Sequence, residues 1–270
     1  SLSPSATIAM NQKSRDLQAK GINVINLSVG EPDFFTPDHI KAAAKKAIDD
    51  NFSFYPPVAG YPDLKKAIAD KFKRENNLDY TPEQVIVSCG AKHSLANAMM
   101  SLVDPGDEVI IPAPYWVSYL EQVVLCEGKP VVIKAGINAN FKITPAQLEA
   151  AITPKTKVLL LCSPSNPSGA VYSKAELRAL ADVLAKHPKI LILSDEIYEH
   201  INFIGGHETI AQFADMKDRT IVINGVSKAY AMTGWRIGYM GAPLWLVKAC
   251  DKLQGQTTTG ATTRRHRRTR

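Results

Sequence analysis

The chain has 270 residues, of which 45% are apolar and 21% charged, a composition typical of a globular protein with one large domain or a large domain plus a small one. Its formal net charge is +6, but five arginines fall within residues 264–270, and the rest of the chain has 27 basic residues against 26 acidic ones. A nearly neutral body gives no sign of a face that binds nucleic acid or a membrane surface.

The first helix is predicted over residues 8–20, closed by a glycine at position 21, and a short strand is predicted over 24–30. Thr36-Pro37 is typical of a helix start, with a capping residue and then a proline in the first turn. Thr81, Thr144 and Ser173 each begin the Ser/Thr-x-x-Gln/Glu pattern of a capping box, which predicts further helix starts.

From residue 84 onward, predicted strands alternate with predicted helices. The strands cover 84–88, 108–111, 130–133, 157–162, 189–193 and 220–223. Their unbroken runs of Val, Ile and Leu are typical of strands covered on both faces, and the alternation with helices predicts a mainly parallel α/β sheet. Ligands of such sheets bind at the carboxyl ends of the strands. The polar or aromatic residues that follow strand ends are Lys92, Trp116, Asn166, Asp195, Tyr198 and Lys228.

Lys228 follows the apolar strand predicted over 220–223. Burial lowers the pKa of an ammonium group, and a neutral amine can form a Schiff base with a carbonyl compound. Ser227 and Arg236 flank this lysine, and a hydroxyl with a guanidinium suits a phosphate. An aldehyde cofactor that carries a phosphate, pyridoxal 5'-phosphate (PLP), meets both requirements. Taken alone, Lys228 is better interpreted as a surface lysine in a loop.

Other residues acquire meaning only in combination with Lys228. Gly90-Ala91 lies between a strand and a helix, which suits either an anion site or a tight turn. Asp195 would pair with a protonated pyridine nitrogen, cap a helix or join a buried ion pair. Asn166 lies in a rigid proline-rich turn, and Trp116 would stack on a flat ring or pack in the core.

Metal and disulfide chemistry are not indicated. The four cysteines are widely spaced and form no Cys-x-x-Cys pair, so we expect reduced thiols. No two histidines are separated by three residues, so a zinc site is not expected. The sequence has no signal-peptide pattern and no apolar run of membrane-spanning length. We therefore expect a cytoplasmic protein that has neither nucleic acid nor membrane as a partner.

Four segments together resemble the class I, fold-type I PLP-dependent aminotransferases, and within them most closely the bacterial aspartate aminotransferases. They are Gly30-Glu-Pro-Asp-Phe34, Ser163-Pro-Ser-Asn-Pro-Ser-Gly169, Ser194-Asp-Glu-Ile-Tyr-Glu-His200 and Ser227-Lys-Ala-Tyr-Ala-Met-Thr-Gly-Trp-Arg-Ile-Gly238. The resemblance implies a mainly parallel sheet of the seven-stranded type, sandwiched by helices, as the large PLP-binding domain, with an incomplete small domain. It covers the chain from about Pro4 to Gly260.

The resemblance also implies a role for each matching residue. Lys228 is expected to form the Schiff base and move the α-proton, Asp195 to pair with the pyridinium nitrogen, and Tyr198 and Asn166 to bond the phenolic oxygen. Gly90, Ala91, Ser227 and Arg236 are expected to hold the phosphate, and Trp116 to stack on the ring. Gly30 is expected to line the substrate side. Ser5, Thr7 and Lys92 are expected to hold the distal carboxylate of the substrate, and Lys92 is also expected beside the cofactor. Tyr55 is expected to reach the phosphate of a neighbouring subunit, which implies a homodimer.

The same resemblance divides the chain into an N-terminal arm with part of the small domain (1–35), a large PLP-binding domain (36–260) and a basic tail unlike the family (261–270). Because the family continues further, with an arginine that grips the substrate α-carboxylate, the chain is expected to be C-terminally truncated and its tail to be an out-of-frame end. Binding of nucleic acid by that tail is the less favoured interpretation.

The expected function is transamination of an amino acid, aspartate above all, with 2-oxoglutarate, in amino acid biosynthesis. Shared motifs do not separate this from another fold-type I PLP enzyme, such as an aromatic aminotransferase or a β-lyase, because function resides in the site. An inactive truncated fragment is a third possibility, from a different class.

Overall fold

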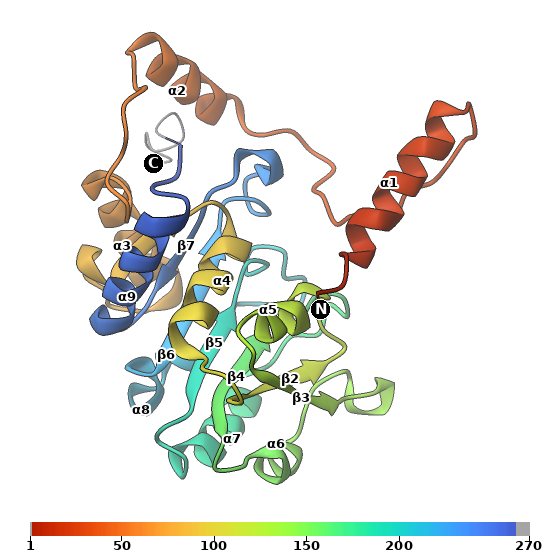
Figure 1. Ribbon diagram of the computed structural model, residues 1–270, viewed down its shortest axis with the longest axis vertical. Helices are drawn as coiled ribbons and strands as arrows, with labels where there is room; N and C mark the ends of the chain where they lie inside the picture. Colours follow the sequence, from red (N-terminus) through yellow and green to blue (C-terminus); the bar gives the residue numbers. More distant parts are fainter. Residues whose placement is uncertain (1, 263–270) are drawn as a thin grey trace.

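A seven-stranded sheet forms the centre of the computed structural model, which describes residues 2–262 (Figure 1). The strand order is β1-β7-β6-β5-β4-β2-β3. The strands are β1 (Val85–Ser88), β2 (Glu108–Ala113), β3 (Lys129–Lys134), β4 (Thr156–Cys162), β5 (Leu191–Asp195), β6 (Thr220–Gly225) and β7 (Gly238–Gly241). Strands β3, β2, β4, β5 and β6 are mutually parallel, while β7 runs antiparallel to both β6 and β1. The predicted mainly parallel sheet is confirmed.

Helices cover both faces of this sheet. The helices that follow α1 (Ala6–Ala19) in the chain are α2 (Asp38–Asp49), α3 (Pro62–Asn76), α4 (Ala91–Leu102), α5 (Ser118–Leu125), α6 (Pro145–Ala151), α7 (Lys174–Ala185), α8 (Ala214–Lys217) and α9 (Leu244–Thr257). Of these, α2 stands apart from the sheet (Figure 1). Short 3-10 helices are η1 (Pro82–Gln84), η2 (Ile137–Ala139), η3 (Ile210–Gln212) and η4 (Thr233–Trp235). One core cluster contains residues of α4, α5 and α9, and another those of α6 and α7. Along β4, Leu160 packs in the first cluster and Leu159 and Leu161 in the second, as the alternation of side chains along a strand requires.

The N-terminal arm stands apart from this body. Helix α1 (Ala6–Ala19) projects away from the sheet, and none of its residues is buried (Figure 1). The strand predicted over 24–30 is wrong, because these residues pair with no other strand and form no regular element. Ile25 and Leu27 are 84% and 90% exposed. Their segment has the composition of a strand but no sheet edge to join.

The helix-start signals lead to different elements. Thr144 and Ser173 cap α6 and α7 as predicted, each accepting a hydrogen bond from the third residue of its helix. Thr81 has the same box but opens only the 3-10 turn η1, since β1 starts directly after it. Helix α2 begins one residue later than predicted, with Pro37 as its capping residue. Strand β7 was not predicted, because two of its four residues are glycines.

The domain boundaries at residues 35 and 260 stay predictions. Most of the predicted basic tail, including its five arginines at 264–270, lies outside the described residues. Across residues 2–262, no helix combines the length and the apolar character needed to cross a membrane.

Candidate active site

The carboxyl ends of β5 and β6 bring the two central predicted residues together. Asp195 is the last residue of β5, and Lys228 lies three residues after β6 ends at Gly225. Each shifts the pKa of the other through its charge, so the two side chains share one electrostatic environment. The structure thus brings these two predicted residues near each other, and their roles stay predictions.

Asp195 is a buried carboxylate with neutral donors. Only 3% of the residue is exposed. Its Oδ2 accepts a 2.7 Å hydrogen bond from the Tyr119 hydroxyl, and its Oδ1 accepts one of 3.2 Å from the backbone N–H of Ile197. Burial raises the pKa of Asp195 to about 6, although the bond from Tyr119 and the charge of Lys228 act in the opposite direction. This carboxylate can thus attract a cation or a proton in the site.

Lys228 is half-buried, and its amine donates to the carbonyl oxygen of Gly30. Burial lowers the pKa of Lys228, and the charge of Arg236 adds to this effect, while Glu31 and Asp195 oppose it. The amine lies 5.5 Å from the ring centroid of Tyr198. A partly desolvated amine with a lowered pKa has the properties that a nucleophilic lysine needs.

Arg236 and Gly90 fit each other closely. A Cβ atom on Gly90 would lie only 2.1 Å from a terminal nitrogen of Arg236, so only glycine leaves room for this guanidinium. Arg236 donates to the carbonyl oxygens of Thr233, at 2.8 Å, and Cys89, at 3.3 Å. Gly90 precedes Ala91, the first residue of α4, whose first N–H groups have no acceptor within the helix. A guanidinium beside a helix N-terminus is a favourable place for a phosphate.

The other predicted residues surround this centre from several elements. The Asn166 amide donates to the Tyr198 hydroxyl at 3.5 Å, and burial raises the pKa of Tyr198 to about 12, so this phenol stays protonated at neutral pH. The Lys92 amine lies 4.7 Å from the Trp116 ring centroid. Burial and the charge of Arg236 lower the pKa of Lys92, which means that these two cations lie near each other.

A cavity of about 460 Å³ opens beside Lys228. Gly30, Glu31, Tyr198 and Lys228 line it, together with residues 32–34, 200, 201, 203 and 229. The arm segment that follows α1 thus forms one wall, and the turn after β5 forms another. The volume suits a small molecule rather than a macromolecule.

The other three predicted residues belong to the part of the chain that precedes β1. Tyr55 is 92% exposed, and Ser5 and Thr7 lie at the start of α1. The Ser3 backbone N–H donates to Glu121 of α5 at 2.9 Å, which ties the base of the arm to the sheet domain.

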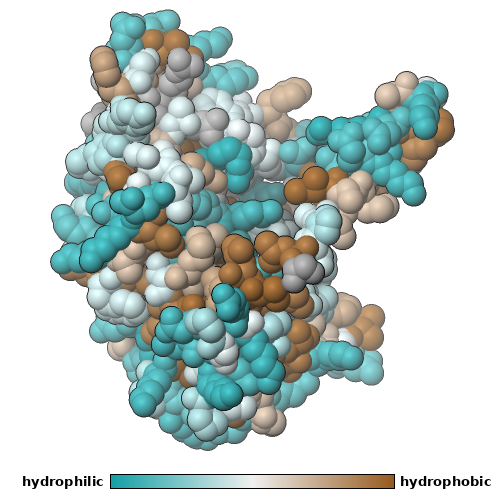
Figure 2. Space-filling model, viewed as in Figure 1, coloured by the Kyte–Doolittle hydropathy of each residue, from teal (hydrophilic) through white to brown (hydrophobic). Residues whose placement is uncertain are grey.

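Apolar side chains gather on the face around α5, where Val117 and Leu125 are exposed (Figure 2).

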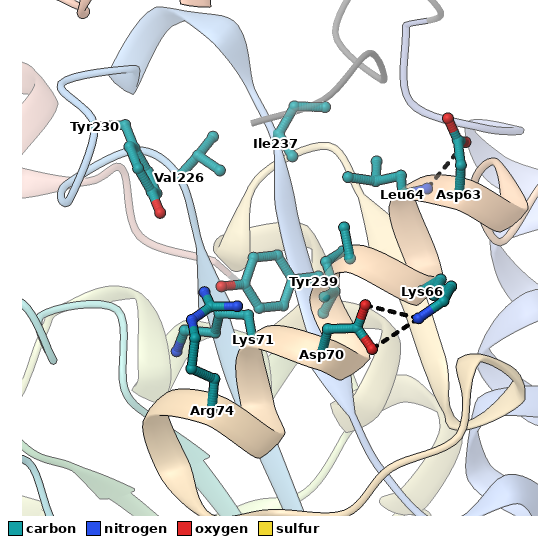
Figure 3. A pocket seen from close by; sticks show the side chains of 12 residues that line it. Asp63, Leu64, Lys66, Asp70, Lys71, Arg74, Val226, Tyr230, Ile237 and Tyr239 are labelled. Carbon is teal, nitrogen blue, oxygen red and sulfur yellow. Dashed lines mark hydrogen bonds and ion pairs between the residues drawn. The ribbon is translucent and has the colours of Figure 1, made fainter. Parts of the chain in front are cut away.

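A larger cavity, of about 640 Å³, lies between α3 and the residues around β7 (Figure 3). Val226, Ile237 and Tyr239 line one side of it, and at its edge Lys66 pairs with Asp70 at 2.8 Å. None of the predicted site residues lines this cavity, although all of them lie in the described part of the chain. We therefore place the candidate active site at Lys228 and not at this larger cavity.

Two groups of acidic and histidine residues have the composition of metal ligands: Glu75, Glu199 and His200, and Glu196, Glu199 and His207. Both groups share Glu199, whose carboxylate already has a cationic partner in the protein. Lys71 forms an ion pair with Glu199, and His207 Nε2 lies 2.8 Å from a carboxylate oxygen of Glu196. This arrangement is that of a buried ion-pair network, which needs no metal for charge balance.

The sequence and fold match known proteins. Residues 22–264 match the model of the family described as Aminotransferase class I and II. The chain belongs to this family. It is 55% identical over 258 residues to the aspartate/prephenate aminotransferase of Cereibacter sphaeroides, a match that covers 95% of this chain and 64% of that protein. The chain spans about two thirds of the length of its curated relatives.

Solved structures of aspartate aminotransferases have the same fold. The aspartate aminotransferase from Rhizobium meliloti superimposes with a TM-score of 0.94 at 49% identity, covering 98% of this chain and 67% of that one. The aspartate aminotransferase from Thermus thermophilus with maleate gives 0.95 at 43% identity, covering 98% and 69%.

Sequence reasoning missed two contributors to the candidate site. Tyr119 bonds Asp195, and Glu31 lines the cavity and accepts a 2.8 Å hydrogen bond from Thr233. Glu31 lies within the Gly30-Glu-Pro-Asp-Phe34 motif and was open to prediction from it. Tyr119 had no such signal, because a tyrosine in the first turn of a helix is typical of core packing.

Proposed function

We propose that this chain carries the PLP site of an aminotransferase, with Lys228 as the residue that bonds the cofactor. The observation that carries the proposal is the meeting of Lys228 and Asp195 at one strand edge. Lys228 has a lowered pKa, as a nucleophilic amine requires, and Asp195 is a buried acceptor for a cationic ring nitrogen.

The residues present fit PLP at each of its chemical groups. Arg236, packed against Gly90 at the start of α4, would hold the phosphate with Ala91 and Ser227. Tyr198 and Asn166, already hydrogen-bonded to each other, would hold the phenolic oxygen. Trp116 would lie against the ring face, and Asp195 would accept a hydrogen bond from the protonated ring nitrogen.

PLP, when bound, supplies an electron sink that makes the α-proton of an amino acid acidic. The residues of this chain would orient the substrate and move its proton. The Lys228 amine would act as the general base for the α-proton, since burial lowers its pKa. The Asp195 carboxylate would stabilise the positive charge of a protonated ring nitrogen. A positioned general base of this kind contributes about 10²–10⁴-fold to the rate.

We propose aspartate as the preferred amino donor and 2-oxoglutarate as the acceptor. The names of the relatives support a dicarboxylic substrate. Lys92 lies near Arg236 at the site, and two adjacent cations favour a second carboxylate. Ser5 and Thr7 at the base of the arm would complete this distal-carboxylate site, and Gly30 the substrate face.

A second candidate is transfer to or from an aromatic substrate. The relative from Cereibacter sphaeroides is named for prephenate as well as aspartate, and another structural neighbour is an aromatic aminotransferase from Pyrococcus horikoshii, with a TM-score of 0.88 at 38% identity. A panel of aspartate, phenylalanine and tyrosine with 2-oxoglutarate separates the two. Preference for an aromatic donor would overturn the aspartate assignment without affecting the cofactor.

A homodimer remains part of this proposal. Phe54 and Tyr55 are 81% and 92% exposed, as expected of side chains that a partner subunit covers. Tyr55 would then reach the phosphate of the neighbouring site. A cytoplasmic location and a role in amino acid biosynthesis also stay predictions from the sequence.

The test of the proposal is covalent labelling. The purified chain is incubated with PLP, reduced with borohydride and digested, and the modified peptide is identified by mass spectrometry. We expect the label on Lys228, its loss in Lys228→Ala and its retention in Lys92→Ala, which removes another lysine at the same strand edge. A label spread over surface lysines, or unchanged in Lys228→Ala, would exclude the proposed site.

A further inference from the structure

Tyr119 and Asp195 form a closed contact at the floor of the candidate site. Tyr119 is 2% exposed and Asp195 3%, and their oxygens are 2.7 Å apart. Tyr119 lies in the first turn of α5, and its ring packs edge-to-face on Trp116, with centroids 5.4 Å apart and planes at 87°. Packing therefore holds the ring in place, and the hydroxyl stays directed at the carboxylate.

The Tyr119 hydroxyl has one proton, which it donates in a hydrogen bond to the Asp195 carboxylate. Burial, with the charge of Asp195, raises the pKa of Tyr119 well above its ordinary value, so the phenol remains protonated at neutral pH. The other carboxylate oxygen, Oδ1, accepts a single hydrogen bond within residues 2–262, from the N–H of Ile197. The Asp195 carboxylate thus keeps acceptor capacity for a third partner.

We propose that Tyr119 is a positioning residue for the proposed cofactor site, whose hydroxyl fixes the orientation of the Asp195 carboxylate and stabilises it as an anion. The cofactor part of this inference rests on the proposed function. The contact between the two side chains does not, and it can be tested in the unloaded chain. No charged side chain hydrogen-bonds this buried carboxylate in the described residues, so the neutral phenol is its one side-chain donor.

Other titratable groups also face Asp195. Glu196 follows it in the turn, Lys228 approaches from the loop after β6, Cys162 comes from β4 and Tyr198 from the turn after β5. Burial raises the pKa of Cys162 to about 12 and that of Tyr198 to about 12, so neither changes charge near neutral pH. None of these four neighbours, all within the described residues, donates a side-chain hydrogen bond to the Asp195 carboxylate as Tyr119 does.

The experiment follows the titration of Asp195 by ¹³C NMR in protein labelled at the aspartate carboxyl carbons, with Asp195→Asn used to assign the signal. Tyr119→Phe removes only the hydroxyl. Because a hydrogen bond to a charged group is strong, we expect the pKa of Asp195 to rise from about 6 to about 7 or above, a tenfold or greater change in proton affinity.

Tyr80→Phe is the matched control. The Tyr80 hydroxyl is also buried but has no hydrogen-bond partner among the described residues, and its removal should leave the Asp195 titration unchanged. An unchanged titration in Tyr119→Phe, or equal shifts in both variants, would overturn the proposed role.

A second variant keeps the test decisive if Tyr119→Phe does not fold. Tyr119→3-fluorotyrosine retains the hydroxyl and makes it more acidic, so the bond to Asp195 should strengthen and the pKa of Asp195 should fall. The absence of a fall would contradict the proposal.

In the PLP-bound chain, Tyr119→Phe should also weaken PLP affinity several-fold, measured by quenching of protein fluorescence. Since the titration needs no cofactor, failure of PLP labelling and failure of the Tyr119 role remain separate results.

Discussion

The sheet domain and the N-terminal arm differ in how far they expose their apolar side chains. On β4, Leu160 is 1% exposed and lies in a cluster shared by β6 and three helices. In the arm, Leu27 is 90% exposed, and Phe35 just before α2 is 92% exposed. The first region is stabilised by its own contacts, whereas the second has apolar side chains available to another surface.

This difference shows which residues of the candidate site are held in place by packing. Asp195, Lys228 and Arg236 all lie at or beyond the carboxyl ends of packed strands, where neighbouring side chains restrict them. Gly30 and Glu31, which close the cavity from the other side, lie on the arm segment without regular structure. The floor of the site is therefore expected to be rigid, and its arm wall to depend on the surface against which the arm packs.

Truncating one leucine in each region should give the largest contrast. Leu160→Ala removes a buried side chain from the centre of the sheet and should lower the free energy of unfolding by about 2–5 kcal/mol. Leu27→Ala removes an exposed side chain and should change it by less than about 0.5 kcal/mol. Urea unfolding followed by circular dichroism measures both. A loss above about 1 kcal/mol in Leu27→Ala that grows with protein concentration would reveal a partner surface on the arm.

A pair of glutamines should give the next largest contrast. Gln254 of α9 is fully buried, accepts from Ser88 at 2.7 Å and Asn97 at 2.9 Å, and donates to the carbonyl oxygens of Val58 and Val87. Gln254→Ala leaves these groups without a partner and should cost about 2–4 kcal/mol.

The control is Gln18→Ala in the arm, whose amide donates a single exposed bond of 3.3 Å to Val24. We expect a change of less than about 0.5 kcal/mol in the same unfolding experiment. Similar losses in both variants would show that the arm is as tightly integrated as the sheet domain.

The same contrast explains how much of the fold was open to prediction. The parallel strands were found because unbroken Val, Ile and Leu runs mark strands covered on both faces, as in β4. Strand β7 was missed because Gly238 is required by close approach: a Cβ there would lie 2.1 Å from the backbone nitrogen of Ala91. The false strand at 24–30 had the composition of a strand but no neighbour, which composition alone does not reveal.

The site divides in the same manner. The strand-end rule and the family motifs located Asp195, Asn166 and Lys228, because sequence position determines which end of a strand a residue follows. The rule does not detect a partner that approaches from a helix, as Tyr119 does. Such contacts depend on how α5 packs on the sheet, which is a property of the three-dimensional structure.

Substitution of Asp195 should change stability less than the Leu160 and Gln254 variants do, and with the opposite sign. Burial raises its pKa to about 6, so the folded chain binds this proton more tightly than the unfolded chain does. The contribution to stability is therefore greatest below the ordinary aspartate pKa and is lost as the pH rises to about 6. Asp195→Asn, which is neutral at all pH values, should stabilise the unloaded chain at pH 8 by about 1–2 kcal/mol.

The pH dependence of this gain separates electrostatics from packing. Near pH 4 the wild-type carboxyl is protonated in the folded state, so the difference between variant and wild type should nearly vanish there. Asp215→Asn is the surface control: its hydrogen bond with Arg178 lowers the pKa of Asp215, and its removal should cost at most about 1 kcal/mol at pH 8. Thermal unfolding between pH 4 and 8 measures all three proteins. If Asp195→Asn instead destabilises the chain at pH 8, the buried carboxylate anion stabilises the fold. The prediction that this anion lowers the stability of the unloaded chain would then be wrong.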